Sequence, residues 1–258
     1  MLAGADSIDD LGVLRAGGTD RVVGAVRAPS TIGTFLREFA HGHVLQLGKV
    51  NRVLLGRLVG EIAALAGTEG GLVMVDMDDT IREVHGYAKQ AAAFGYSGVR
   101  GLNALLVTIC GQDAAPVIAE ASLRRGNVRS GDNAAHHLAR ALATLAQSLP
   151  ERQVLTRADS AFCTYENVSC ALRHGAWFSF TIPQWPTVQR AIAGISENAW
   201  TRIEYPNAIR DPETGELISD AEVAEAPFTA FVSRSKDEQI ACRLAVRRVK
   251  RLNENRKQ

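Results

Sequence analysis

The sequence predicts an α/β fold in which helices flank a mixed β-sheet, with a helical segment before it and a β-rich region toward the C-terminus. Two observations lead to this prediction. The first 67 residues carry apolar side chains at helical spacing, for example Ile32, Phe35 and Phe39 on one face. After Gly71, short apolar runs typical of buried strands alternate with helical stretches, and this alternation is the pattern of a mixed α/β sheet.

Residues 1–67 are predicted to be mostly helical. A short helix is expected at residues 6–16. A longer helix is expected to begin at Pro29 and to be interrupted by Gly42. A third is expected from about residue 44 to residue 66.

Residues 68–258 are predicted to form the sheet and the helices around it. The expected strands cover residues 72–75, 102–110, 116–123, 153–158 and 177–182. The expected helices cover residues 132–149 and 166–174. Beyond these, one helix alternates with β-like runs at residues 200–205, 228–233 and 240–249.

The composition is that of an ordinary globular chain. Of its 258 residues, 46% are hydrophobic and 22% are charged, and the formal net charge is +1. This argues against disorder and gives no sign of nucleic-acid binding. The four cysteines form no Cys-x-x-Cys pair, and His136 and His137 lack partners at ligand spacing, so a zinc site is not expected. With no signal peptide and no long apolar run, we expect a cytoplasmic chain outside the membrane.

Three carboxylates follow the first apolar strand, at Asp76, Asp78 and Asp79. Because side chains alternate along a strand, Asp76 and Asp78 share one face and Asp79 points away. Two neighbouring carboxylates repel each other unless a cation or a shared proton intervenes. Oxygen ligands of this kind suit Mg²⁺. A metal site at the strand end is therefore one interpretation, and a solvated acidic turn capped by Asp79 is the other.

The string Asp76-x-Asp78-x-Thr80-Ile81 resembles the first motif of haloacid dehalogenase-type phosphatases. That resemblance implies Asp76 as the nucleophile and Asp78 as a general acid or base. The same class needs an acidic Gly-Asp motif near a later strand end. The pair Gly131-Asp132 instead precedes a predicted helix, where Asp132 is expected as the N-cap.

A wider set of residues resembles the DDE transposases of bacterial insertion sequences. Asp78-Asp79-Thr80 is similar to the family's first motif, and the glycine-containing segment 94–101 follows it as a hairpin would. Arg157-x-Asp159-Ser160-x-Phe162 is similar to the second motif. Further similarities extend the resemblance from about residue 3 to about residue 252.

This resemblance implies a ribonuclease-H-like catalytic domain over residues 68–258, with a β-rich insertion at about 176–249. It also implies that Asp78 and Asp159 are catalytic and hold Mg²⁺ or Mn²⁺ for two-metal cleavage and joining of DNA. The expected partners are double-stranded DNA, both element ends and target, and a second copy of the chain. Residues 1–67 are expected to be a DNA-binding or accessory segment. The cations expected to contact DNA phosphates are Arg82, Lys89, Arg100, Arg124 and Arg125.

The family's third carboxylate has no counterpart in a matching motif. Tyr205 is followed by Ala208 and Pro212 where the family has arginine and glutamate. Other glutamates are present at Glu222, Glu225 and Glu238. We therefore expect a copy truncated at both ends, with weak or no activity. A second interpretation, from a different functional class, is a non-catalytic DNA-binding remnant of such a gene.

Overall fold

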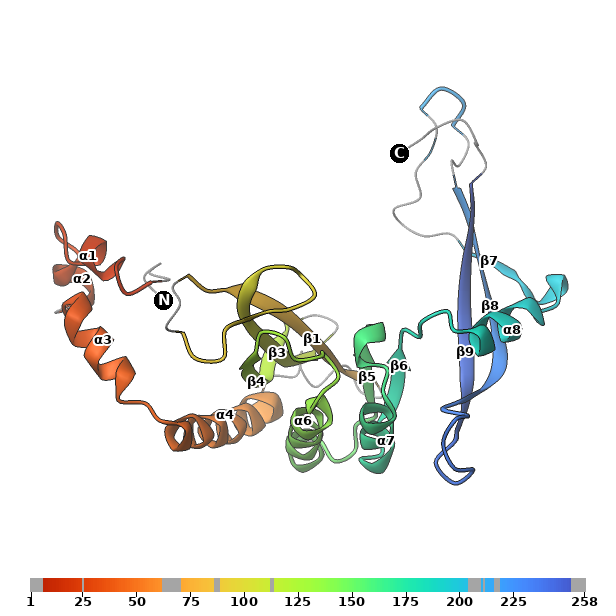
Figure 1. The fold of residues 1–258 in the computed structure, drawn as a ribbon, viewed down its shortest axis with the longest axis horizontal. Coiled ribbons are helices and arrows are strands. Elements are labelled where there is room, and N and C mark those ends of the chain that lie inside the picture. Colours follow the sequence, from red (N-terminus) through yellow and green to blue (C-terminus); the bar gives the residue numbers. More distant parts are fainter. Residues whose placement is uncertain are drawn as a thin grey trace. The chain divides into compact units, whose positions relative to one another are not determined.

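The structure is a computed structural model that describes a large part of the chain (Figure 1). The described residues are 7–24, 26–61, 71–85, 89–111, 114–203, 210, 212–215 and 219–251. They fall into two compact units. The first unit contains residues 1–162 and 166–179, and the second contains residues 163–165 and 180–258.

Helices make up the N-terminal part of the first unit. They are α1 (Leu11–Leu14), α2 (Asp20–Val23), α3 (Pro29–Arg37) and α4 (His41–Glu61). The predicted interruption at Gly42 is wrong, because Gly42 lies inside α4 and the break falls between Arg37 and His41. A single glycine costs a helix only about 1 kcal/mol. The short helix predicted at residues 6–16 is reduced to the single turn of α1.

A mixed sheet forms the centre of the first unit, in the order β2-β3-β1-β5-β6, with β4 also paired to β3. The strands are β1 (Val73–Glu83), β2 (Ala93–Phe94), β3 (Arg100–Cys110), β4 (Val117–Arg125), β5 (Val154–Ala158) and β6 (Trp177–Phe180). Strand β1 runs antiparallel to β3 and parallel to β5. This is a mixed α/β arrangement with flanking helices, as the sequence predicted.

Strand β1 is longer than predicted. The sequence places its end at the acidic residues, whereas β1 pairs with β3 from Met74 to Glu83. The carboxylates of Asp76, Asp78 and Asp79 therefore lie in the middle of a strand. All three residues pair with β3, and Asp76 also pairs with Arg157 of β5. Backbone pairing with β3 over ten residues outweighs the weak strand preference of the polar residues themselves.

The two faces of the sheet differ. Val73, Val75 and Met77 on β1 are buried on one face, where α4 and α6 (Ala134–Ser148) cover the sheet. Asp76 and Asp78 alternate with them and point to the other face, where the side chains of β1, β3 and β4 are half-buried or exposed. We call these the packed face and the open face.

Close backbone approach shapes one end of the sheet. A Cβ atom on Gly126 would clash with the carbonyl oxygens of Gly101 and Ala93, so only glycine fits where β4 leads into the loop before α6. That loop ends at Asn133, which adopts a left-handed conformation with φ 57° and precedes the helix. The predicted N-cap at Asp132 is therefore wrong.

The second unit is rich in β structure, as predicted. It contains α8 (Pro186–Ala193) and an antiparallel sheet of β7 (Thr201–Ile203), β8 (Ser219–Ala230) and β9 (Ile240–Arg251). The strand predicted at residues 228–233 is instead the end of β8 and the turn after it, where Phe231 has φ 61°. Helix α7 (Tyr165–Arg173) starts after the 3-10 turn η1 (Ser160–Phe162), and from Glu166 onward it belongs to the first unit.

None of the helices within the described residues is long and apolar enough to cross a membrane.

Candidate active site

Two exposed carboxylates, Asp78 and Asp159, lie where β1 and β5 run side by side. Strands β1 and β5 are parallel, with Asp76 opposite Arg157 and Met77 opposite Ala158. Continuing this register by one residue places Asp159 beside Asp78, with the strands roughly 5 Å apart. Asp78 and Asp159, which are 81 positions apart in the sequence, therefore lie on neighbouring segments of the sheet.

Both side chains are exposed, and each has one oxygen engaged. The backbone N–H of Asp79 donates to Oδ1 of Asp78 at 2.8 Å. The backbone N–H of Ala161 donates to Oδ1 of Asp159 at 2.9 Å, because η1 begins directly after Asp159. No described residue donates a hydrogen bond to either Oδ2. Two hard oxygen atoms are therefore available on adjacent strands.

A third carboxylate on the same face, Asp76, is already occupied. Arg157 donates to it through Nε at 2.7 Å and Nη2 at 2.6 Å, and Cys110 donates through Sγ at 3.3 Å. Burial raises the pKa of Asp76, but the hydrogen bonds from Arg157 and Cys110 and the charge of Arg157 outweigh this, so the net pKa lies below its ordinary value. Asp76 is thus an ionised partner of Arg157 rather than a free ligand.

The donor set suits a partly hydrated divalent cation. Mg²⁺ commonly binds through one or two carboxylates and completes its shell with water and substrate phosphate oxygens. Asp78 and Asp159 match this requirement. Within the described part of the chain, no group of three or more acidic, histidine or cysteine side chains could hold a metal.

The neighbouring Asp79 points to the packed face and has a different environment. Arg124 donates to its Oδ2 at 2.8 Å, Asn103 donates to the same oxygen at 2.6 Å, and Ser130 donates to Oδ1 at 3.1 Å. The Asp79 and Arg124 side chains are only 7% and 8% exposed. Asp79 therefore belongs to an internal polar network, as the alternation predicted, and it does not cap a solvated turn.

The prediction that Arg124 contacts DNA needs correction. Besides Asp79, its guanidinium donates to the side chain of Asn103 and to the backbone carbonyls of Ser130 and Asp132. All three guanidinium nitrogens are engaged inside the protein. Burial lowers the pKa of Arg124, although the charges of Asp79 and Asp132 oppose this. Arg124 therefore links the loop before α6 to the sheet.

The other predicted DNA contacts lie in accessible places. Arg82 and Arg125 are exposed, and both flank Leu102 on the open face, the face that carries Asp78. Lys89 is exposed ahead of β2, and Arg100 is half-buried at the start of β3. Their contacts with DNA remain predictions.

Two features of the site were not found in the sequence. One is the Arg157–Asp76 pair, whose signal was an arginine two residues before Asp159 on the same face of β5. The other is Glu120, which is 5% exposed on β4 and lies 2.8 Å from Arg52 and 3.5 Å from His137. His137, for which the sequence offered no ligand partner, is buried against this carboxylate.

The glutamates considered for the third carboxylate all lie in the second unit, and each is ion-paired. Glu222 pairs with Arg248, Glu225 with Arg243, and Glu238 with Arg234. These pairs give each of them a local structural role.

The chain matches one protein family and is similar to several solved structures. The sequence profile of the family described as transposase DDE domain group 1 matches residues 2–252. Among solved structures, the chain is similar to a Mos1 transposase paired-end complex with the left transposon end, with 12% identity, a TM-score of 0.27, and coverage of 67% of this chain and 57% of that one. A Mos1 mariner paired-end complex with Mn gives 11% identity, a TM-score of 0.28, and coverage of 67% and 58%. The chain thus spans less than two-thirds of those chains, and no protein of curated function matches it.

Proposed function

The chain belongs to the transposase DDE domain group 1 family, and from that premise we propose that it cuts and joins DNA at the ends of a bacterial insertion sequence. Asp78 and Asp159 are the proposed catalytic carboxylates and the ligands of Mg²⁺ or Mn²⁺. The observation that supports the proposal is the parallel register of β1 and β5, which, continued by one residue, pairs the exposed Asp78 with the exposed Asp159. The expected cytoplasmic location is part of this proposal.

The bound cations would supply positive charge that activates the attacking oxygen and stabilises the departing one. In the first step, a water oxygen forms a bond to phosphorus and the P–O3′ bond breaks, which leaves a free 3′-hydroxyl. In the second step, that hydroxyl attacks a phosphodiester of the target, and the target's P–O3′ bond breaks. Each step exchanges one P–O bond for another, so placement of the reacting groups does most of the work.

The protein's own residues position these groups. Asp78 and Asp159 are held by backbone N–H groups that fix each carboxylate through one oxygen. Arg157 neutralises Asp76, so that the open face carries two uncompensated carboxylates rather than three. Arg82, Arg125, Lys89 and Arg100 are the proposed phosphate contacts for double-stranded DNA. Two copies of the chain would bring two element ends together.

A second candidate is a non-catalytic DNA-binding protein. The absence of a third carboxylate beside Asp78 and Asp159 among the described residues favours it. The phosphatase alternative is disfavoured, because a nucleophilic carboxylate needs a free oxygen and both oxygens of Asp76 accept hydrogen bonds.

The test is Mg²⁺- or Mn²⁺-dependent nicking of duplex DNA that carries the element ends, by the wild-type chain and by Asp159→Asn. The proposal expects nicking that needs the cation and is lost in Asp159→Asn. Asp237→Asn, an exposed aspartate in the turn after β8, is the matched control and should nick like the wild type. DNA binding without nicking selects the second candidate. Hydrolysis of a small phosphomonoester that is lost in Asp76→Ala selects the phosphatase.

A further inference from the structure

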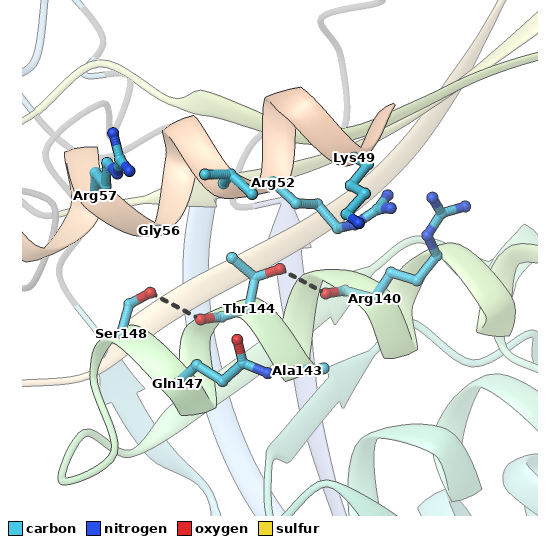
Figure 2. A pocket seen from close by; sticks show the side chains of 10 residues that line it. Lys49, Arg52, Gly56, Arg57, Arg140, Ala143, Thr144, Gln147 and Ser148 are labelled. Carbon is cyan, nitrogen blue, oxygen red and sulfur yellow. Dashed lines mark hydrogen bonds between the residues drawn. The ribbon is translucent and has the colours of Figure 1, made fainter. Parts of the chain in front are cut away.

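Helices α4 and α6 form a groove lined by positive charge on the packed side of the sheet (Figure 2). Its volume is about 650 Å³. The cations that line it are Lys49, Arg52 and Arg57 from α4 and Arg140 from α6. No carboxylate is among its lining residues, whose remaining members are apolar or uncharged polar side chains. This charge imbalance distinguishes the groove from the rest of a chain whose net charge is only +1.

A buried carboxylate holds two of the cations in place. Glu120 on β4 accepts a hydrogen bond from Nη1 of Arg52 at 2.8 Å and lies 3.6 Å from Nε of Arg140. Asn51 donates to the backbone carbonyl of Ala119 at 3.0 Å and so fixes α4 on the same strand. The guanidinium groups of Arg52 and Arg140 are therefore positioned by the protein before any ligand arrives.

The remaining two cations are uncompensated. Lys49 and Arg57 are exposed, and no described carboxylate pairs with either. Figure 2 shows the charged ends of Lys49, Arg52 and Arg140 near one end of the groove and Arg57 toward the other end of α4. At Gly56 helix α4 lies close to α6, since a Cβ atom there would come within 3.1 Å of the Ser148 hydroxyl. The groove therefore has four cations and only one nearby buried carboxylate, and this excess of positive charge attracts anions.

We propose that this groove binds the phosphate backbone of duplex DNA at a second site, separate from the carboxylates that would cut it. The spacing fits a polyanion: Lys49 and Arg57 are eight residues apart on α4, roughly 12 Å at 1.5 Å per residue. That length matches about three to four phosphates of one strand at 3.4 Å each. A single phosphate ion could not contact both ends.

A second copy of the chain is a poorer occupant of the groove. A two-fold interface would place the same cations of both copies against each other, and like charges repel.

The groove and the carboxylates lie on opposite faces of one sheet. Glu120 is registered with Val107 on the packed face, whereas Asp78 is registered with Leu106 on the open face. Duplex held in the groove is therefore not the segment being cut at Asp78 and Asp159 of the same copy. The groove acts as an anchor for DNA away from the cleavage point. This inference rests on the proposed function, because it takes DNA to be the ligand.

The experiment compares the wild type with Lys49→Ala/Arg57→Ala, which removes the two unpaired cations and leaves the partners of Glu120 in place. Binding of a fluorescently labelled duplex is measured by anisotropy in EDTA, where no cleavage occurs, over a range of salt concentrations. We expect about tenfold weaker binding, and a slope of log K against log[salt] that is smaller by about 1.8, because each phosphate contact contributes about 0.9.

The matched control is Arg190→Ala/Lys236→Ala, which removes the same charge from exposed positions in the second unit. It should bind DNA like the wild type. An unchanged affinity and slope in the groove variant would overturn the inference, and so would an equal loss in both double variants, which would indicate a bulk charge effect. Light scattering gives another contradicting outcome: a groove variant with altered oligomeric state and unchanged DNA affinity would make the groove an interface between copies.

Nicking by the wild type separates this inference from the proposed function. A wild type that binds duplex through the groove but never nicks it would contradict the proposed catalytic activity and leave the groove intact. If the wild type nicks DNA and the groove variant keeps full DNA affinity in EDTA, only the proposal that the groove binds DNA would be contradicted.

Discussion

Asp78 and Asp79 are neighbours on one strand, yet they lie in opposite environments. Asp78 is exposed on the open face with an oxygen that no described residue engages. Asp79 is enclosed on the packed face by Arg124, Asn103 and Ser130. A carboxylate that stays in water keeps its hydration and remains available for a ligand, whereas a buried one must be paired. Strand alternation therefore divides one acidic run into a carboxylate that stays accessible to ligands and a carboxylate that is paired inside the protein.

The same division extends to the arginines. Arg124 on the packed face has every guanidinium nitrogen engaged, and its neighbour Arg125 on the open face is exposed. Arg157 is intermediate: it pairs with Asp76 on the open face but stays 42% exposed. The comparison predicts that substitutions on the packed face reduce stability and that substitutions on the open face change ligand binding.

The largest effect on stability is expected for Arg124→Met. It leaves Asp79 buried without its cation, and breaking such a pair typically costs about 3–5 kcal/mol. The adjacent Arg125→Met should change the free energy of unfolding by no more than about 0.5 kcal/mol. Urea unfolding of both variants makes the comparison, and similar losses in the two would contradict the distinction between the faces.

A smaller, pH-dependent effect is expected for Glu120→Gln. Burial raises the pKa of Glu120, but hydrogen bonds from His137 and Arg52 and the charges of Arg140 and Arg52 lower it more, so the net pKa lies below its ordinary value. Such a group stabilises the fold above the ordinary glutamate pKa of about 4.3, and the stabilisation is lost as the pH falls through the lowered pKa.

We therefore expect wild type to exceed Glu120→Gln in stability by about 1–3 kcal/mol at pH 7, with the difference shrinking below about pH 4. Urea unfolding at several pH values measures it. A difference that is the same at pH 7 and pH 3.5 would show that the ion pairs of Glu120 contribute nothing.

Within the open face, Arg157→Gln should change metal binding more than stability. A half-exposed ion pair contributes only about 0–1 kcal/mol to folding. Releasing Asp76 adds a negative charge beside Asp78, worth about 1 kcal/mol for a nearby cation in water, or roughly fivefold in affinity. Mn²⁺ titration followed by electron paramagnetic resonance should show tighter binding, and Asp76→Asn/Arg157→Gln should return it to the wild-type value. Weaker binding in Arg157→Gln would contradict this role.

The sequence predicted features that depend on local geometry. Alternation put Asp76 and Asp78 on one face and Asp79 on the other, and apolar runs located β3, β4 and β5 closely. The sequence could not predict that β1 continues to Glu83, because Asp79, Thr80 and Arg82 are polar and pairing with β3 supplies the stabilisation.

The sequence also could not predict which side chains pair across the sheet. Arg124 and Arg125 read alike in a basic run, and only the register of β4 with β3 shows which one faces inward. Glu120 had a signal, a lone acid within the apolar residues 117–121. Its partners Arg52 and His137 come from two different helices, so only the folded structure reveals the buried cluster.

We propose that strand alternation separates catalytic from structural carboxylates, and Asp78→Asn beside Asp79→Asn tests this most directly. Both variants are assayed for Mg²⁺-dependent nicking of element-end DNA and for the free energy of unfolding in urea. The account predicts that Asp78→Asn abolishes nicking and changes stability by less than about 0.5 kcal/mol, while Asp79→Asn loses about 3 kcal/mol of stability. Wild-type nicking by Asp78→Asn, or equal stability losses in the two variants, would contradict it.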